Sequence, residues 1–314
     1  MTACPEIDPS APLQFVINAA SGSSDGDTRR EVIETALQAG RRRGHLHFCQ
    51  PEALQGVALE AAEKARSSST AVVAVGGDGT LNTVAQAAHA SGCPMGVVPY
   101  GTFNYFARSH GIACEPMEAM RMLMDAAAQP VRVGVVNDRV FLVNASLGLY
   151  PDLLEDREAF KRRFGRSRWV AFWAASANLL RPQRQLRLHI EQGASVRDIR
   201  ALTLFVGNNR LQLEQLGVEA SHGHAGGITA VMLKPVGTLA MLGLMLRGAM
   251  GTLGEAQSVE RFAFNQLVVK PTLAHGRRGV KVAFDGEVMR MRAPLHFCAH
   301  TKPLYVLMPP CNNG

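Results

Sequence analysis

Residues 71–81 read Ala-Val-Val-Ala-Val-Gly-Gly-Asp-Gly-Thr-Leu. A run of small and β-branched apolar residues leads into three glycines around one aspartate, and helix-like sequence follows at residues 81–90. This order predicts a buried strand, a tight turn and a helix. Glycines let the backbone approach a phosphate closely, and a helix start offers N–H groups with the positive end of a dipole. The stretch therefore predicts a phosphate-binding turn.

Asp78 is the unexpected residue in this turn, because a carboxylate repels phosphate groups unless a cation lies between them. Mg²⁺ has that role when it is held by a carboxylate together with phosphate oxygens. Thr80 can cap the following helix or bond a phosphate oxygen. No Gly-Lys-Ser/Thr occurs in the chain, and the turn lacks the Gly-x-Gly-x-x-Gly spacing, so neither a Walker A loop nor a dinucleotide fingerprint is present. An ordinary strand–helix turn with an aspartate cap is the alternative.

The sequence around this turn alternates strands and helices up to about residue 130. This alternation predicts a parallel sheet with helices on its faces. Strands are expected at residues 13–17, 71–75 and 95–98, and helices at residues 28–43, 52–66, 81–90 and 115–128.

Beyond residue 130, strand-like segments follow one another, which predicts an antiparallel β-sandwich. They are expected at residues 131–136, 140–145, 185–191, 199–206, 265–270, 279–284 and 303–307, with one long basic helix at 158–180. The predicted division is an α/β nucleotide-binding domain at 1–130 and a β-sandwich substrate domain at 131–314. In an alternative division, the extreme C-terminus returns to the first domain.

Two further segments carry chemistry. Residues 99–108 follow the next predicted strand, so Thr102 and Asn104 are expected at the same sheet edge as the first turn, with Arg108 adding a cation. An ordinary Pro-Gly turn is the alternative there.

Residues 283–288 place Asp-Gly between two strand-like runs, which is a hairpin signal. The functional interpretation makes Glu287 the general base of a phosphoryl transfer.

Three motifs in order, Gly-Gly-Asp-Gly-Thr at 76–80, Pro-x-Gly-Thr-x-Asn-x-Phe-Ala-Arg at 99–108 and Asp-Gly-Glu at 285–287, resemble the diacylglycerol kinase catalytic family. That family includes bacterial lipid kinases and is related to sphingosine and ceramide kinases. Residues 15–22, 141–150 and 205–209 resemble further segments of it. The resemblance implies an α/β domain like that of NAD kinase and phosphofructokinase, a β-sandwich domain, and ATP in the cleft between them.

The resemblance also implies a transfer of the ATP γ-phosphate to a lipid hydroxyl with Mg²⁺. It makes Asp78 the magnesium and nucleotide aspartate and Glu287 the catalytic base, and both are predicted catalytic residues. The predicted nucleotide-binding residues are Asn18, Ser21, Gly22, Gly76, Gly77, Asp78, Gly79, Thr80, Thr102 and Asn104.

The overall composition restricts the kinds of binding partner and the cellular location that are expected. The net charge of +7 favours anionic partners, and no nucleic-acid motif is present. Six scattered cysteines without a CxxC pair predict neither a disulfide framework nor a zinc finger, and they suit the reducing cytoplasm. The chain has no signal-peptide pattern at its start, and the longest apolar run ends at Arg247, short of the roughly 20 residues a spanning helix needs.

The basic, Trp-bearing segment at 161–173 predicts peripheral contact with an anionic membrane surface, with a core-packed helix as the alternative. The sequence does not specify the oligomeric state, and a homodimer is one possibility.

Three other functions stay open at this point. One is a kinase of the same fold that acts on a soluble substrate. Another is an inactive nucleotide-binding regulator, because Tyr105 stands where many family members have Asp. Residues 225–228 read Ala-Gly-Gly-Ile without the Asp of a second metal site, so no second metal is expected. The third is a basic nucleic-acid binder, and the lipid itself is not specified.

Overall fold

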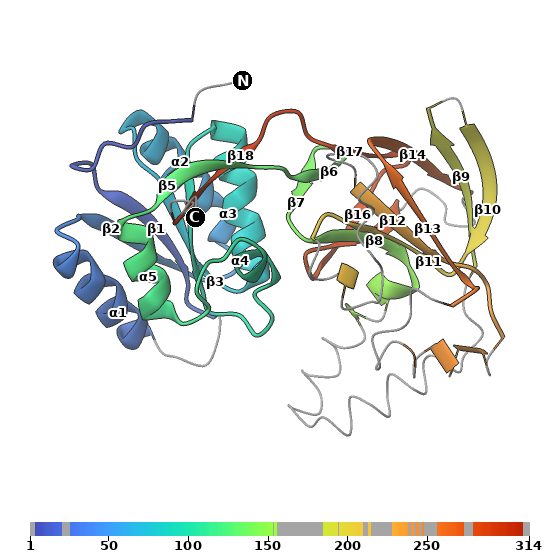
Figure 1. Ribbon diagram of the computed structural model, residues 1–314, viewed down its shortest axis with the longest axis horizontal. Helices are drawn as coiled ribbons and strands as arrows, with labels where there is room; N and C mark the ends of the chain where they lie inside the picture. Colours follow the sequence, from blue (N-terminus) through green and yellow to red (C-terminus); the bar gives the residue numbers. More distant parts are fainter. Residues whose placement is uncertain are drawn as a thin grey trace, which may run out of the picture. The chain divides into compact units, whose positions relative to one another are not determined.

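The chain forms two compact units in a computed structural model (Figure 1). The first unit comprises residues 1–133 and 300–314, and the second comprises residues 134–299. The structural division thus falls after Val133. The structure describes residues 4–20, 26–152, 154–155, 185–193, 195–209, 213–214, 228–237, 240–241, 243–244, 247, 256–272 and 279–309.

The first unit is built on a six-stranded sheet with the order β2-β1-β3-β4-β18-β5. All neighbouring pairs are parallel except β18 and β5. The strands are β1 (Leu13–Asn18), β2 (Gly44–Cys49), β3 (Val72–Gly76), β4 (Met95–Pro99), β5 (Ala127–Val131) and β18 (Leu304–Met308). The central strand β3 is buried along its whole length, as its run of Val and Ala predicts.

Helices cover both faces of this sheet (Figure 1). α2 packs beside α3, and α1 packs beside α5. The helices are α1 (Gly26–Ala39), α2 (Leu54–Ser67), α3 (Asp78–Ser91), α4 (Tyr105–Ser109) and α5 (Pro116–Met124). Alanines line the buried face of α2, so this helix can approach the sheet closely. The predicted α/β fold of this half is confirmed.

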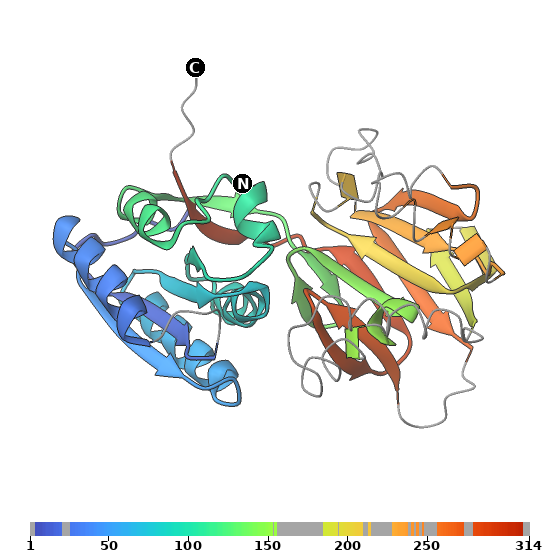
Figure 2. The same ribbon diagram turned by 90° about the horizontal axis from the view of Figure 1, so that it is seen from below.

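The last strand, β18, belongs to the first unit. It lies between β4 and β5, and Figure 2 shows this dark-red strand beside the green one. Residues 303–307 were expected among the strands of the second half unless the extreme C-terminus returned to the first domain, and they form part of the first unit. Four of these residues, Leu304 to Leu307, are buried, and such an apolar run does not reveal which sheet it completes.

The predicted helix at 115–128 is too long. Helix α5 ends at Met124, and Ala127–Val131 is strand β5, which pairs with β18 along its whole length. The alanines at 126–128 favour a helix locally. Pairing with a strand from the far end of the chain overrides that preference.

The second unit is a β-sandwich of two antiparallel sheets, as predicted. One sheet has the order β10-β9-β14-β17-β6-β7 and the other β13-β12-β11-β8-β15-β16. The first contains β6 (Gly134–Val136), β7 (Arg139–Phe141), β9 (Leu186–Gln192), β10 (Ser195–Ala201), β14 (Gln266–Pro271) and β17 (Leu295–Ala299). The second contains β8 (Asn144–Gly148), β11 (Thr203–Gly207), β12 (Ile228–Leu233), β13 (Val259–Phe264), β15 (Val280–Phe284) and β16 (Glu287–Met291). The larger apolar core of this unit, including Phe141, Ile190, Met232 and Phe297, draws side chains from both sheets.

Three predicted strands are each two strands in the structure. Residues 199–206 cover the end of β10 and the start of β11, which lie in different sheets on either side of Leu202. Residues 140–145 likewise cross from β7 to β8, and residues 131–136 cross from β5 to β6. Through the crossings at Leu202 and at Leu142 and Val143, the residues stay apolar because they remain in the core. The hydrophobic pattern therefore hides the change of sheet.

None of the helices in the described part of the chain is long and apolar enough to cross a membrane. The predicted basic helix at 158–180 lies outside the described residues, and so do residues 225–227.

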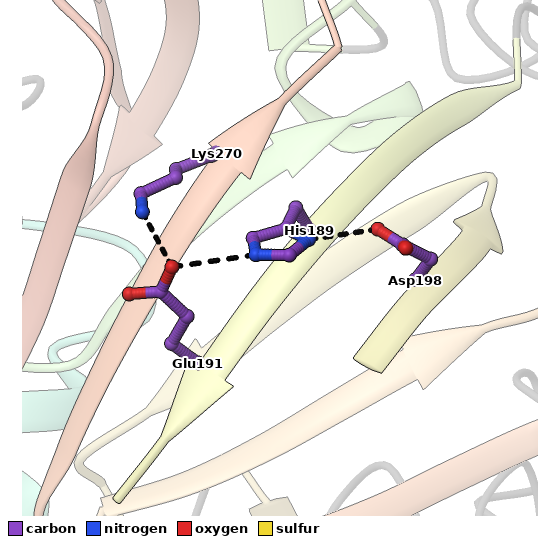
Figure 3. A network of polar contacts seen from close by, with 4 residues as sticks. All are labelled: His189, Glu191, Asp198 and Lys270. Atoms are coloured by element: carbon purple, nitrogen blue, oxygen red, sulfur yellow. Dashed lines mark hydrogen bonds and ion pairs between the residues drawn. The ribbon is translucent and has the colours of Figure 1, made fainter. Parts of the chain in front are cut away.

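Polar contacts cross the exposed side of the β10-β9-β14 strands (Figure 3). His189 Nδ1 lies 2.8 Å from Asp198 Oδ1, and its Nε2 lies 3.3 Å from Glu191 Oε1. Lys270 Nζ donates to the same Glu191 oxygen. These side chains are partly or largely solvated, and the contacts link three neighbouring strands.

Candidate functional site

The carboxyl ends of β1, β3 and β4 meet at one edge of the parallel sheet. Asn18 is the last residue of β1, Gly76 is the last of β3, and Tyr100 follows β4 directly. The backbone N–H of Tyr100 donates to the Gly76 carbonyl oxygen over 2.8 Å, which joins the two loops that leave β3 and β4. The two sequence motifs at 76–80 and 99–108 are therefore neighbours, as their positions after adjacent strands predict.

Helix α3 begins earlier than predicted, at Asp78, with Gly77 as its N-cap. A glycine has no side chain to bond the first N–H groups of the helix, and no side-chain cap is formed. Thr80 is only 3% exposed, and its Oγ1 accepts a hydrogen bond from Asn18 Nδ2 over 3.0 Å. The amide of Asn18 thus ties the end of β1 to the first turn of α3.

Glycine is required where the two loops touch. A Cβ atom on Gly101 would lie 3.0 Å from the Cα of Gly77 and 2.7 Å from Asn104 Oδ1. A Cβ atom on Gly76 would lie 2.6 Å from Thr80 Oγ1. Real Cβ contacts are longer than this, so any larger residue would push the loops apart.

The loop after β4 is held by Asn104. This residue has a left-handed backbone with φ of 50° and is 7% exposed. Its Oδ1 accepts from the Gly101 N–H over 3.1 Å, and its Nδ2 donates to the Gly101 carbonyl over 3.0 Å. The amide that the sequence assigned to the nucleotide thus closes its own loop, while Thr102 is exposed.

Two aromatic rings flank Asn104. Phe103 is 46% exposed and stacks on Tyr105, with ring centroids 5.5 Å apart. Burial raises the pKa of Tyr105, Arg108 opposes this shift, and the negative charge of Asp78 adds to it. Two predicted residues of the opening turn, Ser21 and Gly22, lie outside the described residues.

In the second unit, the predicted hairpin at 283–288 is present. Phe284 of β15 pairs with Glu287 of β16, which leaves Asp285 and Gly286 as a two-residue turn. Both turn residues have positive φ, 46° and 91°, as a type I′ hairpin turn requires. Glu287 is the first residue of β16 and is exposed.

Asp285 is a structural anchor that the sequence did not identify. Its buried carboxylate accepts three backbone N–H groups, from Leu142 (2.7 Å), Val143 (2.8 Å) and Asn144 (3.0 Å). Its own N–H donates to the Asn144 carbonyl. The turn that carries Glu287 is thereby fixed to the connection between β7 and β8.

The same connection receives a third segment. The backbone N–H groups of Asn208 and Asn209 both donate to the Val143 carbonyl, over 2.9 and 3.2 Å. The three segments of the second half that carry the family resemblance therefore meet at the connection between β7 and β8. Loss of surrounding water raises the pKa of the Glu287 carboxyl group although the residue is exposed. The negative charge of Asp285 adds to this shift, and Arg139 opposes it.

The residues present are suited to a nucleotide with one magnesium ion. The uncapped start of α3 and the glycine-lined contact between the loops can accept phosphate oxygens. Asp78 supplies one carboxylate, and no group of three or more His, Cys, Asp or Glu side chains in the described part of the chain could bind a metal alone. A magnesium ion at Asp78 would therefore share its remaining ligands with phosphate oxygens and water.

Comparison with known proteins relates the first half of the chain to one family. The family model of the diacylglycerol kinase catalytic domain matches residues 12–136. Through these residues, the chain is similar to the diacylglycerol kinase catalytic domain family. The match covers the strands and loops that form the Asn18–Thr80 contact.

Two relatives are named as lipid or diacylglycerol kinases. A protein of Pseudomonas aeruginosa (strain UCBPP-PA14) named "Probable lipid kinase YegS-like" is 38% identical over 121 residues, which are 38% of this chain and 40% of that protein. The chain thus spans about two fifths of the length of that relative. A diacylglycerol kinase of Staphylococcus aureus (strain bovine RF122 / ET3-1) is 26% identical over 212 residues, 66% of each chain.

A crystal structure of a diacylglycerol kinase from Bacillus anthracis str. Sterne superimposes with a TM-score of 0.67 and 16% identity. It covers 95% of this chain and 97% of that one, so the two-unit fold is shared along nearly the whole chain.

Proposed function

We propose that this chain is a kinase that uses ATP and Mg²⁺ to phosphorylate a hydroxyl group of a membrane lipid. The observation that carries the proposal is the turn between β3 and α3, where Gly77 caps the helix without a side chain and Asp78 begins its first turn. Such a helix start suits phosphate groups, and the carboxylate suits a divalent cation. The family match and the relatives named as lipid and diacylglycerol kinases support phosphoryl transfer to a lipid.

The first unit would hold the nucleotide. Backbone N–H groups of the first turn of α3 would bind phosphate oxygens, and Asp78 would hold the cation. The bond from Asn18 to Thr80 fixes that turn before binding, so less order has to be created when the phosphates arrive. Bound ATP and Mg²⁺ would supply the phosphoryl group and the neutralising charge of the transfer.

Glu287 would act as the general base. A base works best when its pKa lies near the working pH, and the pKa of Glu287 is raised from the ordinary glutamate value. Its carboxylate would take the proton of the lipid hydroxyl as that oxygen attacks the γ-phosphorus, and the bond from the γ-phosphorus to the bridging oxygen would break so that ADP leaves. Asp285 does not react but holds the turn that presents Glu287.

The lipid would be reached at the membrane surface. The net charge of +7 favours attraction to anionic headgroups, which supports peripheral association. This part of the proposal distinguishes the chain from a kinase of the same fold that acts on a soluble substrate.

The test is phosphorylation in mixed micelles at a fixed bulk lipid concentration and a varied surface fraction. Diacylglycerol, monoacylglycerol, phosphatidylglycerol, ceramide and a sphingoid base would be compared with soluble sugar phosphates and NAD. A lipid kinase shows a rate that follows the surface fraction of one lipid. Transfer to a soluble acceptor in the absence of micelles would overturn the lipid assignment. ATP binding without any transfer would favour the inactive regulator, and Tyr105→Asp would then be the first variant to assay.

A further inference from the structure

Arg29 is a buried cation on the first helix. It is 1% exposed and is among the largest fully buried side chains of the described residues. It lies on the inward face of α1 together with Ile33, Ala36 and Leu37. Burying a guanidinium group costs free energy that an apolar side chain at the same place would not cost. Packing alone therefore does not explain an arginine here.

The contacts of Arg29 reach two different strands. Its Nη1 donates to the carbonyl oxygen of Asn18 over 2.6 Å, at the end of β1. Its Cζ lies 5.0 Å from the ring centroid of Tyr100, directly after β4. Arg29 thus links the carboxyl ends of β1 and β4.

The sheet order locates this link. β3 lies between β1 and β4, and neighbouring strands are about 4.8 Å apart, so β1 and β4 are separated by about 10 Å. A guanidinium that touches residues at the ends of both strands lies across the end of β3. The phosphate-binding turn starts at that end.

Both partners of Arg29 also contact this turn. The amide of Asn18 donates to Thr80 in the first turn of α3, and the Tyr100 N–H donates to the Gly76 carbonyl. Any shift of Asn18 or Tyr100 would therefore move the turn between β3 and α3.

We propose that Arg29 is a positioning residue of the nucleotide site. Its guanidinium holds Asn18 and Tyr100 on either side of the turn, and its permanent positive charge lies beside the place where the phosphates bind. This role rests on the proposed use of ATP. Arg suits it better than Lys because its planar group can donate along its edge and stack with its face at the same time.

The test measures ATP affinity by isothermal titration with Mg²⁺ and without lipid. Arg29→Met is expected to weaken ATP binding at least about tenfold, which is 1.4 kcal/mol. Arg29→Lys keeps the charge and is expected to recover part of this loss. Tyr100→Leu removes the stacking face and is expected to weaken binding severalfold, whereas Tyr100→Phe keeps the face and the wild-type affinity. In the Arg29→Met and Tyr100→Leu double variant, the losses are expected to be less than additive.

The neighbouring Arg30 provides the matched control. It is exposed, bonds Glu34 on its own helix and stacks on Phe48. Arg30→Met is expected to bind ATP like the wild type. Equal ATP affinity of Arg29→Met, Arg29→Lys and the wild type would overturn the proposal. If Arg29→Met fails to fold, the comparison of ATP affinity between Tyr100→Leu and Tyr100→Phe tests the proposal instead. Equal ATP affinity of these two variants would also overturn the proposal.

The lipid-free format separates this inference from the proposed function. A wild-type protein that binds ATP but phosphorylates no lipid would refute the lipid kinase and leave the Arg29 comparison standing. A wild-type protein that binds no nucleotide would refute both.

Discussion

Nδ2 of Asn18 donates a hydrogen bond to Oγ1 of Thr80 over 3.0 Å, and so joins the end of β1 to the first turn of α3. The two residues are far apart in the sequence and belong to different motifs. Thr80 is 3% exposed, so this bond is shielded from water. A shielded bond of this kind fixes the helix start that the proposed phosphate site uses.

Replacing Thr80 by valine tests this contact. Thr80→Val keeps the branched shape but removes the acceptor of the Asn18 amide. The expected loss is about 1–2 kcal/mol in the free energy of unfolding, together with weaker ATP binding. Thr83→Val is the control, because the Thr83 hydroxyl donates to the Gly79 carbonyl oxygen of its own helix. Urea unfolding measures both variants, and equal losses for the two would contradict a special role for Thr80.

Asp285 is expected to be far more important for stability than its place in a two-residue hairpin turn suggests. Asp285→Ala would leave the N–H groups of residues 142–144 without their carboxylate. Each buried unsatisfied N–H costs about 1–3 kcal/mol, so the expected total loss is at least about 3 kcal/mol. Asp285→Asn keeps one acceptor oxygen, and its free energy of unfolding is expected to lie between those of the wild type and Asp285→Ala. An Asp285→Ala protein within about 1 kcal/mol of the wild type in urea unfolding would refute the anchor.

The pH dependence of turnover is expected to report Glu287. The base must be deprotonated, so the rate falls as the pH drops through the raised pKa of this carboxyl group. Arg139 lowers that pKa, and its removal therefore raises it further. In Arg139→Met, the acidic limb of the pH profile of kcat/KM should therefore move to higher pH. Arg197→Met removes a positive charge on β10 and is the control, because it should leave this limb unchanged. A limb that moves to lower pH in Arg139→Met would contradict the assignment.

The charged contacts around His189 are expected to contribute little to stability (Figure 3). The side chains of Asp198 and His189 are 85% and 36% exposed, and exposed ion pairs are typically worth about 0–1 kcal/mol. His189→Ala should therefore lower the free energy of unfolding by less than about 1 kcal/mol. The difference should shrink in about 1 M salt, where the Debye length is about 3 Å. A loss of several kcal/mol in urea unfolding at both salt concentrations would show that the network is structural.

The sequence predicts the turn between β3 and α3 well because its signal is local. An apolar strand, three glycines and a helix follow one another within residues 71–90, and the structure places β3 and α3 there. The hairpin at Asp285 and Gly286 is equally local, since positive φ at two successive residues favours Asp-Gly. In both cases, the residues that form the feature are neighbours in the chain.

Features that depend on distant partners could not be predicted in this way. β5 forms because β18 pairs with it, and the change of sheet at Leu202 leaves the hydrophobic pattern unbroken. Asp285 was assigned only to a turn, because its hydrogen-bond acceptance from residues 142–144 is visible only in the folded chain. One signal was present for Arg29, which occurs at helical spacing from Ile33 and Ala36 on the buried face of α1.

The transfer of labelled γ-phosphate from ATP to a lipid in mixed micelles with Mg²⁺ tests the central claim most directly. The wild type would be compared with Asp78→Ala, Glu287→Ala and the exposed-carboxylate control Asp198→Ala. The account predicts one labelled lipid from the wild type and from the control, and none from the other two variants. Undiminished labelling by Asp78→Ala or Glu287→Ala, or no labelled lipid from a wild-type protein that binds ATP, would contradict it.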